Sequence, residues 1–346
     1  MIHVRVIQHP LDFIKPGGTS RGVLNQKPTW YLHLTDENGN SGWGECSLIP
    51  KLSIDPVDEL EKVLADWNNQ KLSSEELNES FDHARFPALS FALETALIDL
   101  KQAGEGILFP SEFTNGKALI PINGLIWMAP KADMLEQVKS KLEAGFTCIK
   151  LKIGAIDFEE ELEVLKFIRS QFTANEIEIR VDANGAFNPQ DALEKLNRLS
   201  AFHLHSIEQP IKQNQWEQMA QLCASTPLPI ALDEELIGIS DSKQKAACLD
   251  AIQPQYIILK PSLVGGLSAA KEWIDLAEER NIGWWNTSAL ESNVGLNAIA
   301  QWTFTLNTDM PQGLGTGQLF KNNTPSPLYM ENGQVGYNPN ESWSLL

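Results

Sequence analysis

Short apolar runs alternate with amphipathic segments through the chain from about residue 118 onward. Five of these runs have the length and composition of strands, namely CIKLKIG, IEIRVDAN, LHSIEQP, LPIALDEE and YIILKP. Two more strands are expected at 119–123 and from Gly283. Apolar residues at helical spacing predict helices at 132–144, 158–170, 190–199, 215–224 and 268–280. This strand–helix repeat is typical of an α/β barrel.

The first 115 residues follow a different pattern. Residues 4–7, 29–35 and 41–45 predict antiparallel strands, and a turn of sequence ENGN joins the last two. Two helices follow, at about 56–70 and 89–103, so this part is expected to be a separate α+β domain. The chain therefore divides into an α+β domain at 1–115, a barrel at 116–310 and a Gly-, Pro- and Asn-rich segment at 311–346. That last segment is expected to return to the first domain.

Composition narrows the function classes. The 346 residues carry a formal net charge of −18, which argues against nucleic-acid binding because that requires clustered Lys and Arg. No apolar run has the length of a signal-peptide core or a membrane span, and the four cysteines form no CxxC motif. These features predict a cytoplasmic protein with buried, reduced thiols and a small-molecule substrate. The sequence leaves the oligomeric state open.

Five charged residues recur at intervals of 25 to 30 residues: Lys152, Asp182, Glu208, Asp233 and Lys260. Each of them ends or directly follows one of the five apolar runs. The C-terminal strand ends of a barrel converge on one mouth, so these residues are expected to be neighbours. A single charge at a strand end is commonly a helix cap or a solvated loop residue. Five charges in phase with the barrel repeat are much harder to obtain by chance.

This charge pattern predicts proton abstraction beside a bound metal. Three carboxylates without a His or Cys ligand favour Mg²⁺ over zinc, with open positions for a substrate carboxylate and water. A lysine beside a divalent cation and a second ammonium has a lowered pKa. Lys152 is therefore expected to remove a proton α to a carboxylate while the metal stabilises the ene-diolate. Lys260 is expected to act as a second acid/base or as a stabilising cation.

Strand alternation adds three residues to the expected site. Side chains two positions apart share a face, so the predicted base has Lys150 beside it, and the first predicted metal ligand has Arg180 and Asn184. By contrast, the acidic run at 159–163, which includes Glu161, is expected on a solvated helix face.

Longer motifs surround these residues. The strand ends carry KxK at 150–152, DAN at 182–184, EQP at 208–210, DE at 233–234 and KP at 260–261. In these motifs the chain resembles the enolase superfamily, in its muconate-lactonising-enzyme-like branch. Further segments are TSRG, GWGECSLIP, SFALETALIDL, IRVDANGAF, SALESNVG and GLGTGQLF. In them the chain is most similar to the o-succinylbenzoate synthase family of menaquinone biosynthesis, over nearly its whole length.

The resemblance implies an N-terminal α+β capping domain on a modified (β/α)₇β barrel, similar to a TIM barrel. It implies that Asp182, Glu208 and Asp233 hold Mg²⁺, for which Mn²⁺ is a substitute. The implied reaction is the syn dehydration of 2-succinyl-6-hydroxy-2,4-cyclohexadiene-1-carboxylate to o-succinylbenzoate. Lys152 would abstract the α-proton and return it to the leaving hydroxyl, and Lys260 would face the ene-diolate as a stabilising cation.

The resemblance also implies substrate contacts. Cap loops around Ser20, Arg21 and residues 48–50 would close over the succinyl arm, and groups at Ser288 and Ala289 would meet its carboxylate. The expected substrate-binding set is completed by Lys150, Arg180 and Asn184.

Three alternatives stay open from the sequence. An N-acylamino acid racemase or dipeptide epimerase of the same branch needs two opposed lysines, and both are present. Dipeptide epimerases commonly carry an acidic DxD motif where this chain has Gly315-Thr316-Gly317, which counts against that activity. A lysine enzyme that forms a Schiff base is a different class, against which the three in-phase carboxylates argue. A barrel retained only for binding is disfavoured because all five charged positions are intact.

Overall fold

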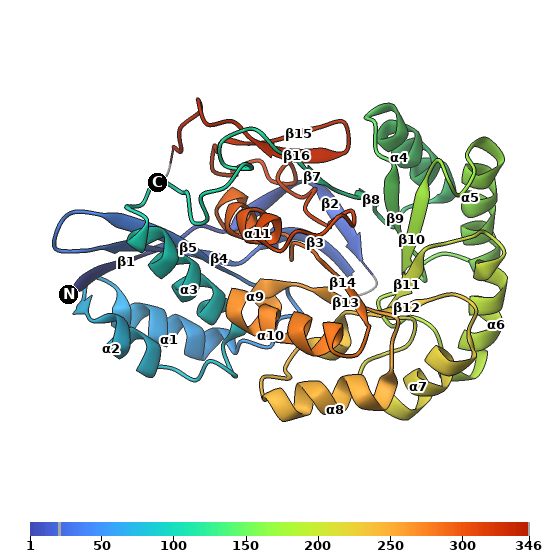
Figure 1. The fold of residues 1–346 in the computed structure, drawn as a ribbon, viewed down its shortest axis with the longest axis horizontal. Helices are drawn as coiled ribbons and strands as arrows, with labels where there is room; N and C mark the ends of the chain where they lie inside the picture. Colours follow the sequence, from blue (N-terminus) through green and yellow to red (C-terminus); the bar gives the residue numbers. More distant parts are fainter. Residues whose placement is uncertain (20–21, 345–346) are drawn as a thin grey trace.

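The computed structural model describes residues 1–19 and 22–344. An antiparallel sheet domain lies beside a parallel barrel, and the N-terminus and the last described residues lie on the side of the sheet domain (Figure 1). The sheet has the order β5-β4-β1-β6, with three helices packed beside it. The elements are β1 (Ile2–Gln8), β4 (Thr29–Thr35), β5 (Ser41–Ser47), β6 (Lys71–Leu72), α1 (Val57–Trp67), α2 (Ser74–Glu79) and α3 (Pro87–Lys101).

Helix α3 packs directly on strand β5. A Cβ on Gly44 would lie 1.9 Å from the Ala92 carbonyl oxygen, so only glycine permits this approach of strand and helix. The next residue, Glu45, is completely buried. The Gly-Glu pair in the GWGE sequence therefore allows the strand and the helix to pack closely and places a buried carboxylate at the boundary with the barrel.

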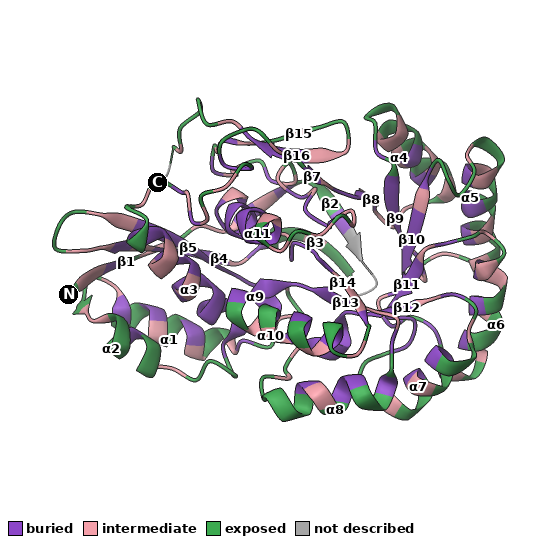
Figure 2. Ribbon diagram, in the orientation of Figure 1, coloured by how far each residue is buried: buried purple, intermediate pink, exposed green. Residues whose placement is uncertain are grey.

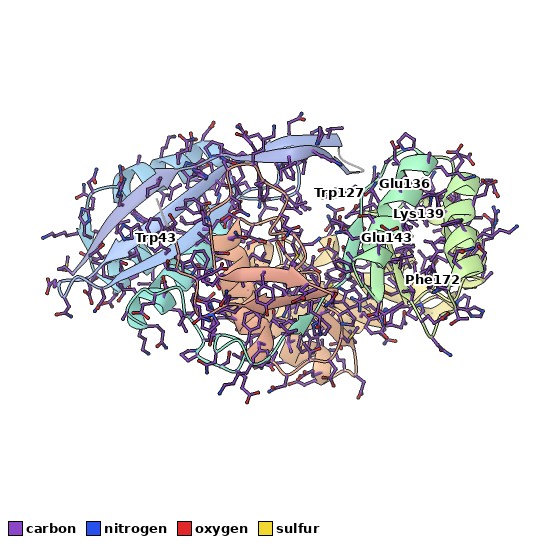
Figure 3. All side chains as sticks on the ribbon, turned by 90° about the horizontal axis from the view of Figure 1, so that it is seen from above. Trp43, Trp127, Glu136, Lys139, Glu143 and Phe172 are labelled. Carbon is purple, nitrogen blue, oxygen red and sulfur yellow. The ribbon has the colours of Figure 1, made fainter. Side chains whose placement is uncertain are left out.

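A two-stranded hairpin extends from this domain toward the barrel (Figure 3). It is formed by β2 (Leu11–Thr19) and β3 (Gly22–Lys27). A Cβ on Gly17 would lie 3.2 Å from the ring of Trp127, which follows the first barrel strand. The hairpin therefore contacts the barrel at Trp127.

The barrel has seven parallel strands in the order β14-β13-β12-β11-β10-β9-β8, with helices on its outside (Figure 1). The strands are β8 (Gly124–Ile126), β9 (Cys148–Lys152), β10 (Glu178–Asp182), β11 (Ser206–Glu208), β12 (Ile230–Leu232), β13 (Tyr256–Leu259) and β14 (Gly283–Asn286). The helices are α4 (Lys131–Glu143), α5 (Phe158–Gln171), α6 (Pro189–Ser200), α7 (Trp216–Ser225), the 3₁₀ turn η1 (Glu234–Leu236), α8 (Ser242–Ile252), α9 (Pro261–Val264), α10 (Leu267–Glu278) and α11 (Asn293–Thr305).

Residues 311–313 close the barrel between its two edges. The Gln312 N–H donates to the Pro121 carbonyl and the Gly313 N–H donates to the Asn286 carbonyl, each over 2.8 Å. Isolated parallel bridges accompany both contacts. These residues were expected in the C-terminal segment, but in the structure they occupy the position of an eighth barrel strand.

The remainder of the C-terminal segment contacts both domains. Strands β15 (Leu328–Glu331) and β16 (Gln334–Tyr337) form an antiparallel sheet with β7 (Ile120–Pro121) at the start of the barrel. Before them, the ring of Phe320 packs on Phe13 of the hairpin, with ring centroids 4.8 Å apart. The segment thus connects the hairpin with the barrel.

Buried residues lie on the strands and on the inner sides of the helices, and exposed residues lie on the outer sides of the helices (Figure 2). On β9, Ile149 and Leu151 are buried in the apolar core that the strands share with the surrounding helices. Alternation turns Lys150 and Lys152 to the opposite face of the same strand, toward the barrel interior. Within the described ranges, no helix is long and apolar enough to cross a membrane.

The predicted barrel helices agree with α4, α5, α6, α7 and α10 to within two residues at each end. Helices α8, α9 and α11 were not predicted. Residues of α11 are buried from Val294 through Thr303, so no polar stripe marks this helix in the sequence. The strand expected at 119–123 is divided, because β7 pairs antiparallel with β16 and the first barrel strand begins only at Gly124.

Candidate active site at the barrel mouth

Parallel register brings the predicted residues together at the C-terminal strand ends. Lys152 lies opposite Asp182, and Asp182 lies opposite Glu208. Asp233 directly follows β12, and Lys260 directly follows β13. Neighbouring parallel strands end at the same edge of the sheet, so the five side chains meet at one mouth of the barrel.

Asp182 is the centre of one group of ion pairs. The Lys150 ammonium lies 3.0 Å from Asp182 Oδ2 and also contacts Glu208 Oε2. The Lys152 ammonium donates to Asp182 Oδ2 over 2.5 Å. Burial by itself would raise the pKa of Asp182, but Lys150 and Lys152 hold it well below its usual range. Asp182 is therefore firmly ionised.

Lys260 is the centre of a second group. Its ammonium contacts Asp233 Oδ2 and lies 3.6 Å from Glu208 Oε1. Burial alone would lower the pKa of Lys260, but the carboxylates of Asp233 and Glu208 raise it above its usual value. Burial and the charge of Asp182 raise the pKa of Glu208 to about 8. The mouth thus holds three lysines against three carboxyl groups, with the pKa values of Asp182 and Asp233 lowered and that of Glu208 raised.

Asp182, Glu208 and Asp233 have the donor chemistry for a divalent cation. They lie on or directly after successive strands, and Glu208 Oε1 is buried without accepting a hydrogen bond. In residues 1–19 and 22–344, however, no three acidic, His or Cys side chains are arranged around one point as a metal site. Lysine ammonium groups lie against the carboxylates instead. The oxygen donors fit Mg²⁺, which prefers carboxylate ligands.

Asn184 connects the predicted base to a further carboxylate. Lys152 Nζ donates to Asn184 Oδ1 over 2.8 Å, and Asn184 Nδ2 donates to Glu234 Oε1 over 2.9 Å. The Asn184 N–H also donates to Asp182 Oδ1 over 2.9 Å. The φ of Asn184 is +45°, in the left-handed region that Asn tolerates better than most residues. The DAN motif thereby holds the Lys152 ammonium at the mouth.

A cavity of about 250 Å³ is bounded by both domains. The capping domain contributes hairpin residues 22–26 and loop residues 49–52. The barrel contributes polar groups from Lys150, Lys152, Asn184 and Lys260, and apolar surface from Leu125 and Trp127. Of the lining residues that the structure describes, none is acidic. A cavity of this kind suits a ligand that has anionic groups and an apolar body.

The turn that contains Ser288 and Ala289 forms another wall of the cavity. Ser288 Oγ donates to Glu291 Oε2 over 2.5 Å and accepts from the Leu290 N–H over 3.0 Å. It also accepts from the Thr316 hydroxyl over 2.8 Å. The Ser288 hydroxyl proton is therefore committed within the protein, so a carboxylate bound here would meet backbone groups of the turn.

Three of the predicted site residues are not among the described residues that line the cavity. One of them is Arg180. Its guanidinium donates to Glu178 Oε1 over 2.7 Å and to the Pro311 carbonyl over 2.8 Å, deeper in the barrel. Arg180 therefore connects strand β10 with residue 311 inside the barrel. Ser20 and Arg21 lie outside the described residues.

Sequence reasoning missed four residues around the site. Lys27 and Glu45 reach the barrel from the capping domain, and Trp127 lines the cavity. Glu161, expected on a solvated face, is instead buried and accepts the Gly154 N–H over 2.6 Å. Burial raises the pKa of Glu161 to about 7. The prediction for Glu161 was wrong because its carboxylate binds the loop that follows β9; among the four, only Glu45 lies in a recognisable motif.

Known proteins are similar to this chain in sequence and in fold. A family model described as "Enolase C-terminal domain-like" matches residues 133–339. The chain is 52% identical to an o-succinylbenzoate synthase from Desulfotalea psychrophila, over 94% of this chain and 96% of the relative. The crystal structure of MenC from D. psychrophila has a TM-score of 0.84 at 48% identity, covering 97% of this chain and 99% of its own.

A more distant structure has the same fold. Muconate lactonizing enzyme from Pseudomonas fluorescens has a TM-score of 0.82 at 22% identity, covering 100% of this chain and 96% of its own. The predicted fold class, a capped and modified (β/α)₇β barrel, is confirmed. The chain belongs to the enolase superfamily and, within it, to the o-succinylbenzoate synthase family.

Proposed function

We propose that this protein catalyses the dehydration of 2-succinyl-6-hydroxy-2,4-cyclohexadiene-1-carboxylate to o-succinylbenzoate in menaquinone biosynthesis. The observation that carries the proposal is the cavity, which three barrel lysines line and to which no described acidic side chain contributes. Such a cavity favours a ligand with two carboxylates and an apolar ring, as this substrate has. The 52% identity to an o-succinylbenzoate synthase supports the same reaction.

In this proposal Lys152 acts first as base and then as acid. It takes the proton from the ring carbon that carries the carboxylate. The electron pair left on that carbon forms the last ring double bond as the neighbouring hydroxyl departs. Lys152 returns its proton to this hydroxyl, so one water leaves and the ring becomes aromatic. Asn184 orients the Lys152 side chain for both steps, because its Oδ1 accepts a hydrogen bond from Lys152 Nζ.

Lys260 has a different role in the proposal. Asp233 and Glu208 raise the pKa of Lys260, which keeps it cationic near neutral pH. It therefore contributes a fixed positive charge to the cavity while negative charge develops on the substrate carboxylate. Asp182, Glu208 and Asp233 would hold Mg²⁺ or Mn²⁺, which supplies Lewis-acid stabilisation of that charge when bound.

N-acylamino acid racemisation is the second candidate activity. The observation that favours it is that Lys152 and Lys260 both line the cavity, as a two-base reaction requires. Dipeptide epimerisation is less favoured, because Gly315 and Thr316 line the cavity where an acidic pair would be needed for a substrate ammonium.

The proposed setting of the reaction is the cytoplasm. All four cysteines are free and buried, as in proteins of a reducing compartment. The net charge of −18 disfavours nucleic acid, so the small-molecule substrate is the expected partner.

The test is to assay both reactions on one preparation. With Mg²⁺ present, the purified protein should convert the cyclohexadiene acid to o-succinylbenzoate, followed by the absorbance of the aromatic product. N-succinylamino acid racemisation should be slower in the same preparation, followed by loss of optical rotation. Absence of dehydration together with rapid racemisation would replace the first function by the second.

A further inference from the structure

Lys27 joins two walls of the cavity that come from different domains. It is the last residue of β3 and directly follows hairpin residues 22–26, which line the cavity. Its ammonium donates to the Ala289 carbonyl over 2.7 Å and to the Leu290 carbonyl over 2.8 Å. Ala289 and Leu290 line the cavity from the barrel. One side chain therefore couples the hairpin wall to the turn wall.

The same two peptide groups are also held at their N–H ends. The carbonyl of Ala289 shares a peptide with the Leu290 N–H, and the carbonyl of Leu290 shares one with the Glu291 N–H. Both N–H groups donate to Ser288 Oγ, over 3.0 and 3.3 Å. A cation on each carbonyl polarises the peptide and strengthens the hydrogen bond of its N–H. Lys27 thereby also anchors the Ser288 hydroxyl within the turn.

The turn has a conformation that needs such support. Leu290 has a φ of +62°, which is unfavourable for an L side chain and persists where surrounding contacts over-determine it. Lys27 supplies two of those contacts. It is 1% exposed; burial lowers the pKa of Lys27, and the nearby carboxylates of Glu291 and Glu45 oppose this shift. Burying an ammonium against neutral carbonyls is costly, which argues for a role beyond filling space.

We propose that Lys27 is a positioning residue for substrate binding, which fixes the cavity wall at Ala289 and Leu290 by binding their carbonyls from the capping domain. The inference rests on the proposed function for the identity of the ligand, whose carboxylate arm lies against this wall. Lys27 is not among the described residues that line the cavity, so it acts through the turn and not by contact.

The principal test is the Lys27→Met variant, which removes the donors and shortens the unbranched side chain by only its terminal atom. The KM for the substrate should rise about 10-fold or more, because two buried carbonyls lose their donor and the turn is displaced. The kcat should change much less, since Lys152 and Lys260 are untouched. Hydrogen exchange of the Leu290 and Glu291 amides should become faster.

Two further variants separate positioning from general stability. Lys27→Arg keeps a cation and its donors, so it should recover most of the KM and of the amide protection. Glu94→Gln is the matched control, because Glu94 on α3 accepts the N–H groups of Leu267 over 2.6 Å and Ser268 over 3.0 Å. It also joins the capping domain to the barrel, but none of its partners lines the cavity. This control should leave the KM and the exchange at 288–291 unchanged.

The proposal is overturned if Lys27→Met keeps both its KM and the protection of the turn amides, or if Glu94→Gln raises the KM equally. If Lys27→Met does not fold, Lys27→Gln retains one donor and is measured in the same way. A wild type that neither binds nor converts the substrate would refute the proposed function. Amide exchange would then still decide whether Lys27 positions the turn, because that readout needs no substrate.

Discussion

Charged residues are buried in two regions of this protein, and their charges are compensated differently. At the barrel mouth, lysines and carboxylates are one another's partners, as for Lys152 with Asp182. At the boundary between the domains, the partners are mostly backbone groups. Lys27 binds two carbonyls, and Glu45 accepts N–H groups from the start of helix α11.

The two arrangements differ in what can replace a partner. At the mouth, an incoming cation can take the place of a lysine beside a carboxylate, and an incoming anion can take the place of a carboxylate beside a lysine. At the boundary, the carbonyls and amides are fixed by the fold and have no substitute. Changes at the mouth are therefore expected to reduce activity more than stability, and changes at the boundary to reduce stability first.

The largest expected effect is the loss of activity in Lys152→Ala. Removing the proposed base should lower kcat for dehydration by at least about 10³-fold. Stability should change little, because Asp182 retains the Lys150 ammonium at 3.0 Å. The measurements are the product absorbance assay and thermal unfolding.

Lys139→Ala is the control for this variant. Lys139 lies on the exposed side of α4, paired with Glu136 over 2.7 Å (Figure 3). Its loss should change neither kcat nor stability appreciably. If Lys152→Ala kept most of its activity, Lys152 would not be the base. The expectation that changes at the mouth reduce activity more than stability would then also be wrong.

Metal removal is the next largest effect. Chelation should abolish dehydration, and Mg²⁺ or Mn²⁺ should restore it. Mg²⁺ should also raise the midpoint of thermal unfolding, since a ligand at a hundredfold excess over its Kd stabilises the native state by about 2.7 kcal/mol. Asp233→Asn should remove most of this shift. A protein whose unfolding does not respond to Mg²⁺, and whose activity survives chelation, would contradict the proposed ligand set.

The contrast between the regions also explains what the sequence could predict. The mouth is built from strand ends in a regular repeat, so apolar runs and charge spacing were enough to bring Lys152, Asp182 and Glu208 together. Arg180 shows the limit of this reasoning. Strand alternation correctly predicted that the Arg180 side chain points into the barrel. Its guanidinium lies deeper than the cavity because it contacts the Pro311 carbonyl, and no local pattern in the sequence predicts that contact.

The contacts at the boundary could not be predicted from local sequence patterns. Lys27 and its first carbonyl partner, Ala289, are 262 positions apart in the sequence. Glu161 lies in an acidic run that is typical of a solvated helix, yet it turns inward to bind the Gly154 N–H. Glu45 accepts N–H groups at the start of helix α11. This helix is buried through most of its length and so lacks the polar stripe of a surface helix. These contacts depend on the tertiary fold and not on periodicity.

A smaller effect is expected for Glu45→Ala, at the boundary. Glu45 accepts the Ser292 N–H and the Gly295 N–H, each over 2.8 Å, and the Ser292 hydroxyl over 2.5 Å. Its loss leaves these donors unpaired at the start of α11 and should lower the free energy of unfolding by about 3 kcal/mol. Urea unfolding measures this change. Glu45→Gln, which keeps an acceptor, should lose less, and a large fall in kcat with unchanged stability would reverse the expected difference between the regions.

The smallest expected effect is the pH dependence of stability due to Asp99. This carboxyl is buried on α3 and accepts the N–H groups of Trp43 over 2.9 Å and Gly106 over 3.0 Å, so its partners are again backbone groups. Burial raises the pKa of Asp99 from 3.8 to about 6, although these hydrogen bonds lower it. The folded state therefore binds the proton more tightly than the unfolded state. Its stabilising contribution is complete below pH 3.8 and is lost as the pH rises through about 6.

Comparing the wild type with Asp99→Asn isolates this contribution, because other buried carboxyls such as Asp55 titrate equally in both. The free energy of unfolding of the wild type, relative to the variant, should fall by about 2 kcal/mol between about pH 4 and pH 7. Urea unfolding at a series of pH values measures it. The control is Asp36→Asn, a partly exposed carboxyl whose pKa is lowered mainly by its hydrogen bond from Asn40, so its effect on stability should have the opposite sign. If the difference in free energy of unfolding between the wild type and Asp99→Asn did not change with pH, two backbone amides would be enough to keep this buried carboxylate ionised. Backbone partners would then stabilise a buried charge as well as the ion pairs of the mouth do.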